Sequence, residues 1–182
     1  MSILWLDTET RSHCNLPAKG AYNYAKDPST EVICMTYAFD DGEAKIWWAG
    51  ESPFPSDVAD HFANGGQIRC HNAGFDRLII WYAICPDYKV PEPKLEQFYC
   101  TAAQSRANCA PGSLEDVGRF ASVSMKKDHR GSQLIRMCCV PPFNTDPEIL
   151  DELGQYALQD VRAMRAISQA MRELSNEELL DY

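Results

Sequence analysis

Two acidic side chains near the N-terminus have the type and spacing needed to bind a divalent cation. Asp7 and Glu9 are two residues apart and follow a short apolar run, so on a strand their side chains would point to the same face. Two carboxylates placed in this way can share Mg²⁺ or Mn²⁺, which prefer oxygen ligands. The pattern Asp-x-Glu is common by chance, however, and a solvated turn after a strand explains the pair more simply. The pair alone is therefore weak evidence for a metal site.

Further carboxylates occur in the middle and near the end of the sequence. Asp76 follows a strand-to-helix turn that contains Gly74, a place where side chains gather at the edge of a sheet. Asp160 lies in a long helical pattern, and Tyr156 precedes it by one turn, so the two side chains share a helix face. Each has an ordinary explanation as well. An acid in a first helical turn favours the helix dipole, and a Tyr–Asp pair suits any half-exposed helix.

Apolar patterning predicts the elements that would carry these side chains. Asp41-Gly42 indicates a hairpin turn, and Asp146-Pro147 indicates the start of a long helix, which could be broken near Gly154. Helix starts are also indicated at 113–116 and 175–178. We predict strands at 3–6, 31–39, 43–48, 67–70 and 97–100, and helices at 55–63, 75–84, 101–107 and about 147–174. This order predicts an α/β chain with a mixed sheet.

The bulk composition predicts one globular domain. The chain has 182 residues, of which 45% are hydrophobic and 24% are charged. The first residues lack the basic region of a signal peptide, and the longest apolar run, 78–85, is too short to span a membrane. The eight cysteines include no Cys-x-x-Cys pair and have no zinc-ligand spacing with the four histidines. We therefore expect reduced thiols, a cytoplasmic location and no membrane partner.

The three acidic motifs are more specific in combination than singly. Because the three motifs occur in one order along the sequence, the chain resembles the DnaQ-like (DEDD) 3′–5′ exonuclease superfamily over residues 3–174. The resemblance implies a ribonuclease H-like α/β fold, with a mixed central sheet of about five strands flanked by helices. Tyrosine four residues before the last acid is typical of the tyrosine subclass, and Gln155 stands where the histidine subclass has its histidine. The motifs that carry the likeness are Asp7-x-Glu9, His71-Asn72-x-x-Phe75-Asp76 and Tyr156-x-x-x-Asp160.

A narrower likeness points to DNA replication. Residues 6–12 and 20–25, with Lys127-Asp128…Gly131…Leu134, resemble the proofreading domain of phage-type family A DNA polymerases. This implies an exonuclease domain at 1–174, and at 175–182 the start of a linker or helix toward a polymerase domain absent from this chain. Two situations agree with this likeness: the domain works with a polymerase in cis or in trans, or it is a stand-alone relative. The implied location is a bacterial or phage-infected cytoplasm. Similar proteins often carry an aspartate near Cys100-Thr101, which this chain lacks.

The family resemblance also implies roles for individual residues. Two Mg²⁺ or Mn²⁺ ions about 4 Å apart would clamp the scissile phosphate at the 3′ end of a single strand. Asp7 would bridge both ions, Glu9 and Asp160 would complete the first site, and Asp76 would hold the second ion through water. Tyr156 would orient the attacking water, and a nucleoside 5′-monophosphate would leave. The candidate substrate contacts are Thr8, Thr10, Arg11, Asn72 and Phe75.

The net charge of −9 argues against a nucleic-acid partner, because lysine and arginine normally neutralise phosphates. Two bound divalent ions would reduce that objection. Lys126, Lys127 and Arg130 are candidate backbone contacts, although a solvated loop is the better interpretation. Two alternatives stay open: a ribonuclease D-type enzyme acting on RNA, and a non-catalytic nucleic-acid-binding module. His71 is more typical of a packed or hydrogen-bonded residue than of a catalytic one.

Overall fold

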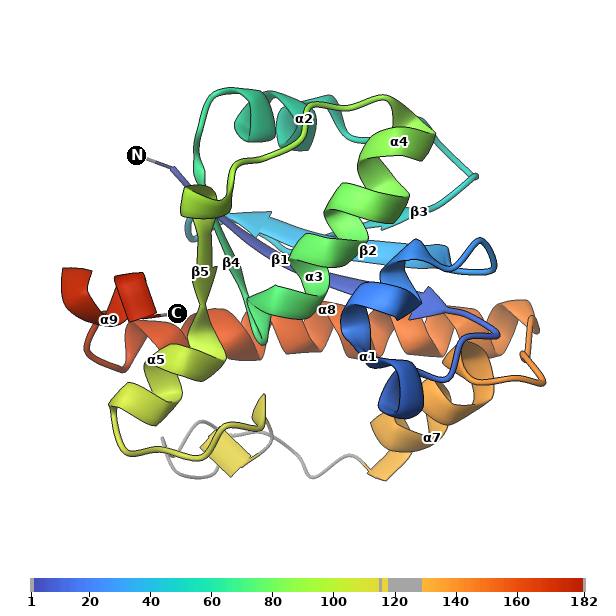
Figure 1. Cartoon of the computed structure of the whole chain (residues 1–182). Coiled ribbons are helices and arrows are strands. Elements are labelled where there is room, and N and C mark those ends of the chain that lie inside the picture. Colours follow the sequence, from blue (N-terminus) through green and yellow to red (C-terminus); the bar gives the residue numbers. More distant parts are fainter. Residues whose placement is uncertain (1, 115, 118–128, 182) are drawn as a thin grey trace.

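The computed structural model describes residues 2–114, 116–117 and 129–181, which are built around one five-stranded sheet of order β3-β2-β1-β4-β5 (Figure 1). β1 pairs antiparallel with β2, which pairs antiparallel with β3, whereas β1–β4 and β4–β5 are parallel. The predicted α/β class with a mixed sheet is confirmed. The strands are β1 (Ile3–Arg11), β2 (Glu31–Phe39), β3 (Lys45–Trp48), β4 (Gln67–Cys70) and β5 (Phe98–Cys100).

Helices cover both faces of this sheet. α8 (Pro147–Gln169) runs along one face, and α1 (Leu16–Lys26) and α3 (Ala73–Ile79) lie on the other (Figure 1). Side chains of β1 alternate between the faces, so Leu4 and Leu6 pack in the core on the α3 side and Trp5 packs against α8. The other helical segments are α2 (Ser56–Ala63), η1 (Ile80–Ile84), α4 (Cys85–Tyr88), η2 (Leu95–Gln97), α5 (Thr101–Ala107), α7 (His129–Cys139) and α9 (Asn176–Asp181).

The first strand is longer than predicted, and this changes the setting of the first acidic pair. We expected the strand to end at residue 6, but β1 continues to Arg11 because the polar residues pair with β2. Asp7 lies opposite Thr36 and Glu9 opposite Cys34, and the register shifts just after Glu9. The two acids therefore lie within a central strand rather than in a turn after it.

The helix after β4 also runs further than predicted. We expected residues 75–84 to form a helix stopped by Pro86, but the chain continues through the π-helical turn η1 into α4, which ends at Tyr88. Pro86 follows directly after this π-helical turn, in which the Cys85 N–H bonds the carbonyl of Ile80, five residues earlier, so the hydrogen-bond register changes just before the proline. Asn72 precedes α3 with a left-handed backbone (φ 71°), which makes the tight turn from the strand.

The start of α8 agrees with its sequence signals, but the break near Gly154 does not occur. Asp146 caps the helix by accepting from the Glu148 N–H, and Pro147 is the first helical residue. The helix is continuous through Gly154, where a Cβ would lie only 2.7 Å from Ile46 Cδ1 and from Trp48 Cζ2. This glycine therefore serves the close packing of α8 on β3.

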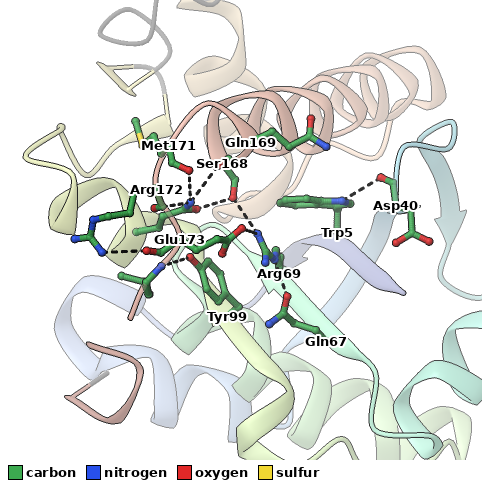
Figure 2. Close-up of polar contacts among 12 residues, drawn as sticks. Trp5, Asp40, Gln67, Arg69, Tyr99, Ser168, Gln169, Met171, Arg172 and Glu173 are labelled. Atoms are coloured by element: carbon green, nitrogen blue, oxygen red, sulfur yellow. Dashed lines mark hydrogen bonds and ion pairs between the residues drawn. The ribbon is translucent and has the colours of Figure 1, made fainter. Parts of the chain in front are cut away.

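α8 ends at Gln169, earlier than predicted. A side chain from α5 forms hydrogen bonds with backbone carbonyls at this end of the helix and just beyond it. Gln104 Nε2 donates to the carbonyls of Ser168 (3.0 Å) and Arg172 (3.1 Å). Beside this cap the Arg69 guanidinium lies over the rings of Trp5 (5.2 Å) and Tyr99 (4.3 Å) and donates to Glu173 at 2.8 Å (Figure 2). The cap and this cluster hold the end of α8 to the sheet.

Two helices had only partial signals in the sequence. α1 was not predicted, although Asn15 caps it by accepting from Ala18 N–H. α7 occupies part of the segment for which a basic loop or a helix start was expected, and 118–128 lie outside the described residues. The start at Ser175 is confirmed, because Ser175 and Glu178 form reciprocal capping bonds. Over the described ranges, no helix combines the length and apolar character needed to cross a membrane.

Candidate functional site

Four carboxylates from three separate segments lie close together. Asp7 and Glu9 come from β1, Asp76 from the first turn of α3, and Asp160 from the middle of α8. The pairing of β1 with β4 ends at Trp5 and Arg69, so Asp7 and Glu9 lie beyond the end of the parallel neighbour. The structure thus brings together all four acids predicted for a metal site.

Burial and neighbouring carboxylates raise the pKa values within this cluster. Burial and then the charges of Asp7, Asp160 and Asp76 raise the pKa of Glu9 well above its ordinary value. Burial and then Asp7 do the same to Asp76, and burial alone raises the pKa of Asp7 to about 6. Hydrogen bonds act in the opposite direction and lower the pKa values of Glu9 and Asp76, but their effect is smaller. The cluster is therefore most stable with protons or with a bound cation.

Thr8 holds Asp76 in place. Oδ1 of Asp76 accepts from the Thr8 backbone N–H (3.1 Å) and from the Thr8 hydroxyl (2.7 Å). Thr8 is buried between the two neighbouring acids of β1. We predicted a substrate contact for this residue. The structure gives its hydroxyl a partner within the site, so Thr8 is a positioning residue for Asp76, and a direct substrate contact stays a prediction.

A Thr8→Val variant tests this positioning role. Valine keeps the shape and the backbone bond but removes the hydroxyl donor, and a lost outer partner typically weakens metal affinity 10- to 100-fold. We expect that loss as a shift in the Mn²⁺ concentration that gives half-maximal hydrolysis. Thr36→Val is the matched control, because the Thr36 hydroxyl, on the strand opposite Asp7, donates to the backbone carbonyl of Ala157 at 3.1 Å rather than to a carboxylate. Equal Mn²⁺ dependence in both variants would contradict the role.

Tyr156 faces the cluster from α8. Its hydroxyl is hydrogen-bonded to Asp160, and burial followed by the Asp160 charge raises its pKa, so the phenol stays protonated. α7 supports the ring from the other side, where a Cβ on Gly131 would overlap it. Arg130 ties α7 to α8 through an ion pair with Glu152 at 2.7 Å. Of the basic residues proposed as backbone contacts, Arg130 is thus engaged within the protein, and Lys126 and Lys127 lie outside the described residues.

Two cavities adjoin the acids. The larger, about 360 Å³, has mostly apolar walls and includes Glu9, Thr10, Tyr24 and Phe75. The smaller, about 110 Å³, is lined by Asp7, His71, Leu114, Asp160 and Met164. Because Glu9 lines one cavity while Asp7 and Asp160 line the other, the carboxylates lie between the two. A small organic group could occupy the larger cavity next to the acids.

Of the other predicted substrate contacts, two line the larger cavity and two line neither cavity. Thr10 and Phe75 line the larger cavity, and the Thr10 hydroxyl lies 3.0 Å from the Tyr24 hydroxyl. Arg11 and Asn72 do not line either cavity. Arg11 forms an ion pair with Glu31 at 2.7 Å. Their roles toward a substrate stay predictions.

Two residues of the site were not predicted from the sequence. Cys139 donates its S–H to Glu9 Oε2 (3.8 Å), and Tyr24 closes the larger cavity against Phe75 with ring centroids 5.8 Å apart. No spacing rule links these residues to the acids, although Tyr24 lies in the 20–25 segment that carried the polymerase likeness. All eight cysteines are free thiols.

His71 is held on both ring nitrogens. Nδ1 lies 3.0 Å from Thr101 Oγ1, and Nε2 lies 2.9 Å from the Gly112 carbonyl. Burial lowers its pKa and favours the neutral ring. It therefore forms part of the wall of the smaller cavity with no ring nitrogen left over.

The donor set fits a hard divalent cation by its chemistry. Four carboxylates offer only oxygen ligands, and the raised pKa values of Asp7, Glu9 and Asp76 show a shortage of positive charge. Within the described residues, no group of three or more His, Cys, Asp or Glu has a geometry that could hold an ion as it stands. One reason lies in Asp76, whose Oδ1 turns to Thr8. Metal binding would require the carboxylates to turn toward a common point.

The chain matches no protein-family model, and no curated protein is detectably similar to it. Its function therefore has to be inferred from the site itself.

Proposed function

We propose that this protein is a metal-dependent 3′–5′ exonuclease that removes nucleotides from single-stranded DNA and releases nucleoside 5′-monophosphates. The observation that supports it is the convergence of Asp7, Glu9, Asp76 and Asp160 from three segments of the chain, in which the other three acids raise the pKa of Glu9 and Asp7 raises that of Asp76. Tyr156 adds a protonated hydroxyl at the same place. This is the constellation that the tyrosine subclass of DEDD exonucleases uses in a ribonuclease H-like fold.

The four carboxylates are the groups that would hold the divalent ions, Mg²⁺ or Mn²⁺. When bound, these ions would supply the positive charge that stabilises a phosphodiester under attack. Asp7 raises the pKa of both Glu9 and Asp76 and would be shared, and Thr8 would keep Asp76 oriented. The apolar walls of the larger cavity would hold the terminal nucleotide and exclude bulk water. Tyr156 would position the attacking water through its hydroxyl, with no need to ionise.

A Tyr156→Phe variant separates positioning of water from folding. Removing only the hydroxyl is expected to lower the single-turnover rate about 10- to 100-fold, since misplacement of a reacting group is costly. The rate is compared at saturating Mn²⁺, because the hydroxyl also bonds Asp160, and the KM for the oligonucleotide and Tm should stay at wild-type values. Tyr99→Phe is the matched control, because the Tyr99 hydroxyl accepts from Leu174 N–H at the far end of α8. A Tyr156→Phe rate equal to wild type would refute the role.

Matched DNA and RNA oligonucleotides of one sequence test the substrate class. The likeness to family A proofreading domains favours DNA, with a polymerase as partner in cis or trans and the bacterial or phage-infected cytoplasm as the place of action. We expect faster shortening of 5′-labelled DNA. Faster shortening of RNA would support a ribonuclease D-type enzyme instead. Binding of both without shortening by folded protein would support the non-catalytic module.

A further inference from the structure

Two exposed aromatic rings form a pair on the surface of the described residues. Tyr22 on α1 is 51% exposed and Tyr82 on η1 is 38% exposed, and their ring centroids are 5.6 Å apart in an edge-on arrangement. Lys26 Nζ lies 5.0 Å and 5.3 Å from the two ring centroids and donates to the Tyr22 hydroxyl at 3.2 Å. Core packing does not account for a cation held over two solvent-facing rings.

The elements that carry this aromatic pair are α1, which also lines the larger cavity, and η1, which directly follows the cavity-lining helix α3. Leu16 and Pro17 at the start of α1 and Phe75 in α3 line that cavity beside Glu9. Tyr82 follows Phe75 by seven residues, across the junction of α3 with the π-helical turn η1, and α1 contacts both of these segments. α1 lies beside α3 in Figure 1. A path therefore leads from the acids along the seam between α1 and α3 to the pair.

We propose that Tyr22, Tyr82 and Lys26 form a docking surface for the single strand upstream of the nucleotide being removed. The proposal rests on the exonuclease function. Bases stack on exposed aromatic rings whatever their sequence, and a lysine beside the rings can neutralise a phosphate. The positive charge at this surface matters all the more in a chain of net charge −9.

Binding of 5′-fluorescein-labelled dT10 to the full chain in EDTA tests the surface without hydrolysis. For the Tyr22→Ala/Tyr82→Ala double variant we expect Kd to rise about tenfold or more, because each stacked base contributes strongly. Tyr22→Phe/Tyr82→Phe keeps the rings and should stay within about twofold of wild type. Lys26→Gln should reduce the slope of log Kd against log salt by about one. Leu95→Ala, at another exposed hydrophobic side chain, is the control.

Hydrolysis of dT2 and dT10 with Mn²⁺ separates this proposal from the exonuclease itself. The alanine double variant should raise KM for dT10 and leave dT2 hydrolysis unchanged, since dT2 has only one nucleotide upstream of the one that is removed. A Kd for dT10 equal to that of Leu95→Ala would overturn the docking surface and leave the exonuclease standing. Tyrosine-dependent binding of dT10 without hydrolysis of either substrate would instead refute the exonuclease and keep the surface.

Discussion

Asp7→Asn is expected to abolish hydrolysis, with a loss of at least about a thousandfold. Asp7 lies among the other three acids and contributes to the raised pKa values of Glu9 and Asp76, so it is the carboxylate best placed to serve both ions. Each ion supplies several kcal/mol of transition-state stabilisation, and about 4 kcal/mol corresponds to a thousandfold in rate. The variant replaces one oxygen by nitrogen and keeps the size of the side chain.

Initial rates on a 5′-labelled single strand at saturating Mg²⁺ measure this loss. Glu51→Gln is the matched control, because Glu51 is an exposed acid remote from the cavities. The circular dichroism spectrum should be unchanged in both variants. An Asp7→Asn rate within tenfold of wild type would mean that Asp7 holds no essential ion.

The same substitution is expected to stabilise the metal-free protein at neutral pH. Burial raises the pKa of Asp7 from 3.8 to about 6, so ionising it costs the folded state about 3 kcal/mol relative to the unfolded chain. The contribution of this group to stability is full below pH 3.8 and is lost as pH rises through 6. Asparagine carries no charge at any pH and removes that loss.

Thermal unfolding in EDTA between pH 4 and pH 8 measures this difference. Asp7→Asn should unfold close to wild type at pH 4 and roughly 6–12 °C higher at pH 8, from 2–4 °C per kcal/mol for a chain of this size. Added Mn²⁺ should raise the Tm of wild type at pH 8 and have much less effect on the variant. A constant Tm difference across the whole pH range would show that ionisation of the buried Asp7 carboxyl is not its cause.

Activity should follow the same ionisations. Metal ligands must be deprotonated, so hydrolysis at saturating Mg²⁺ is expected to rise with pH through the mildly acidic range. Rates on one oligonucleotide in buffers from pH 5 to 8 measure the rise. Equal rates at pH 5 and pH 8 would contradict the link between the carboxylates and metal binding.

Local signals in the sequence predicted those parts of the fold that depend on neighbouring residues. The cap at Asp146 and the five strands were found because capping and alternation act over a few positions. The length of β1 was not predicted, because its polar half is held by pairing with β2 across the sheet. The π-turn before Pro86 and the packing role of Gly154 likewise depend on contacts outside their own segments.

The candidate site shows the same division. The four acids were predicted only through the order of three motifs, since each pair alone fitted an ordinary strand or helix. The partners of those acids could not be predicted, because Thr8 meets Asp76 over 68 positions and Cys139 meets Glu9 over 130. Gly131 was noted only as part of a family likeness, and its contact with Tyr156 depends on how α7 packs on α8.

Degradation of a 5′-labelled single-stranded DNA oligonucleotide with Mg²⁺ or Mn²⁺ tests the central claim most directly. We predict a ladder that shortens from the 3′ end, releases nucleoside 5′-monophosphates and disappears in EDTA. An oligonucleotide left intact by folded protein with either metal would contradict the claim.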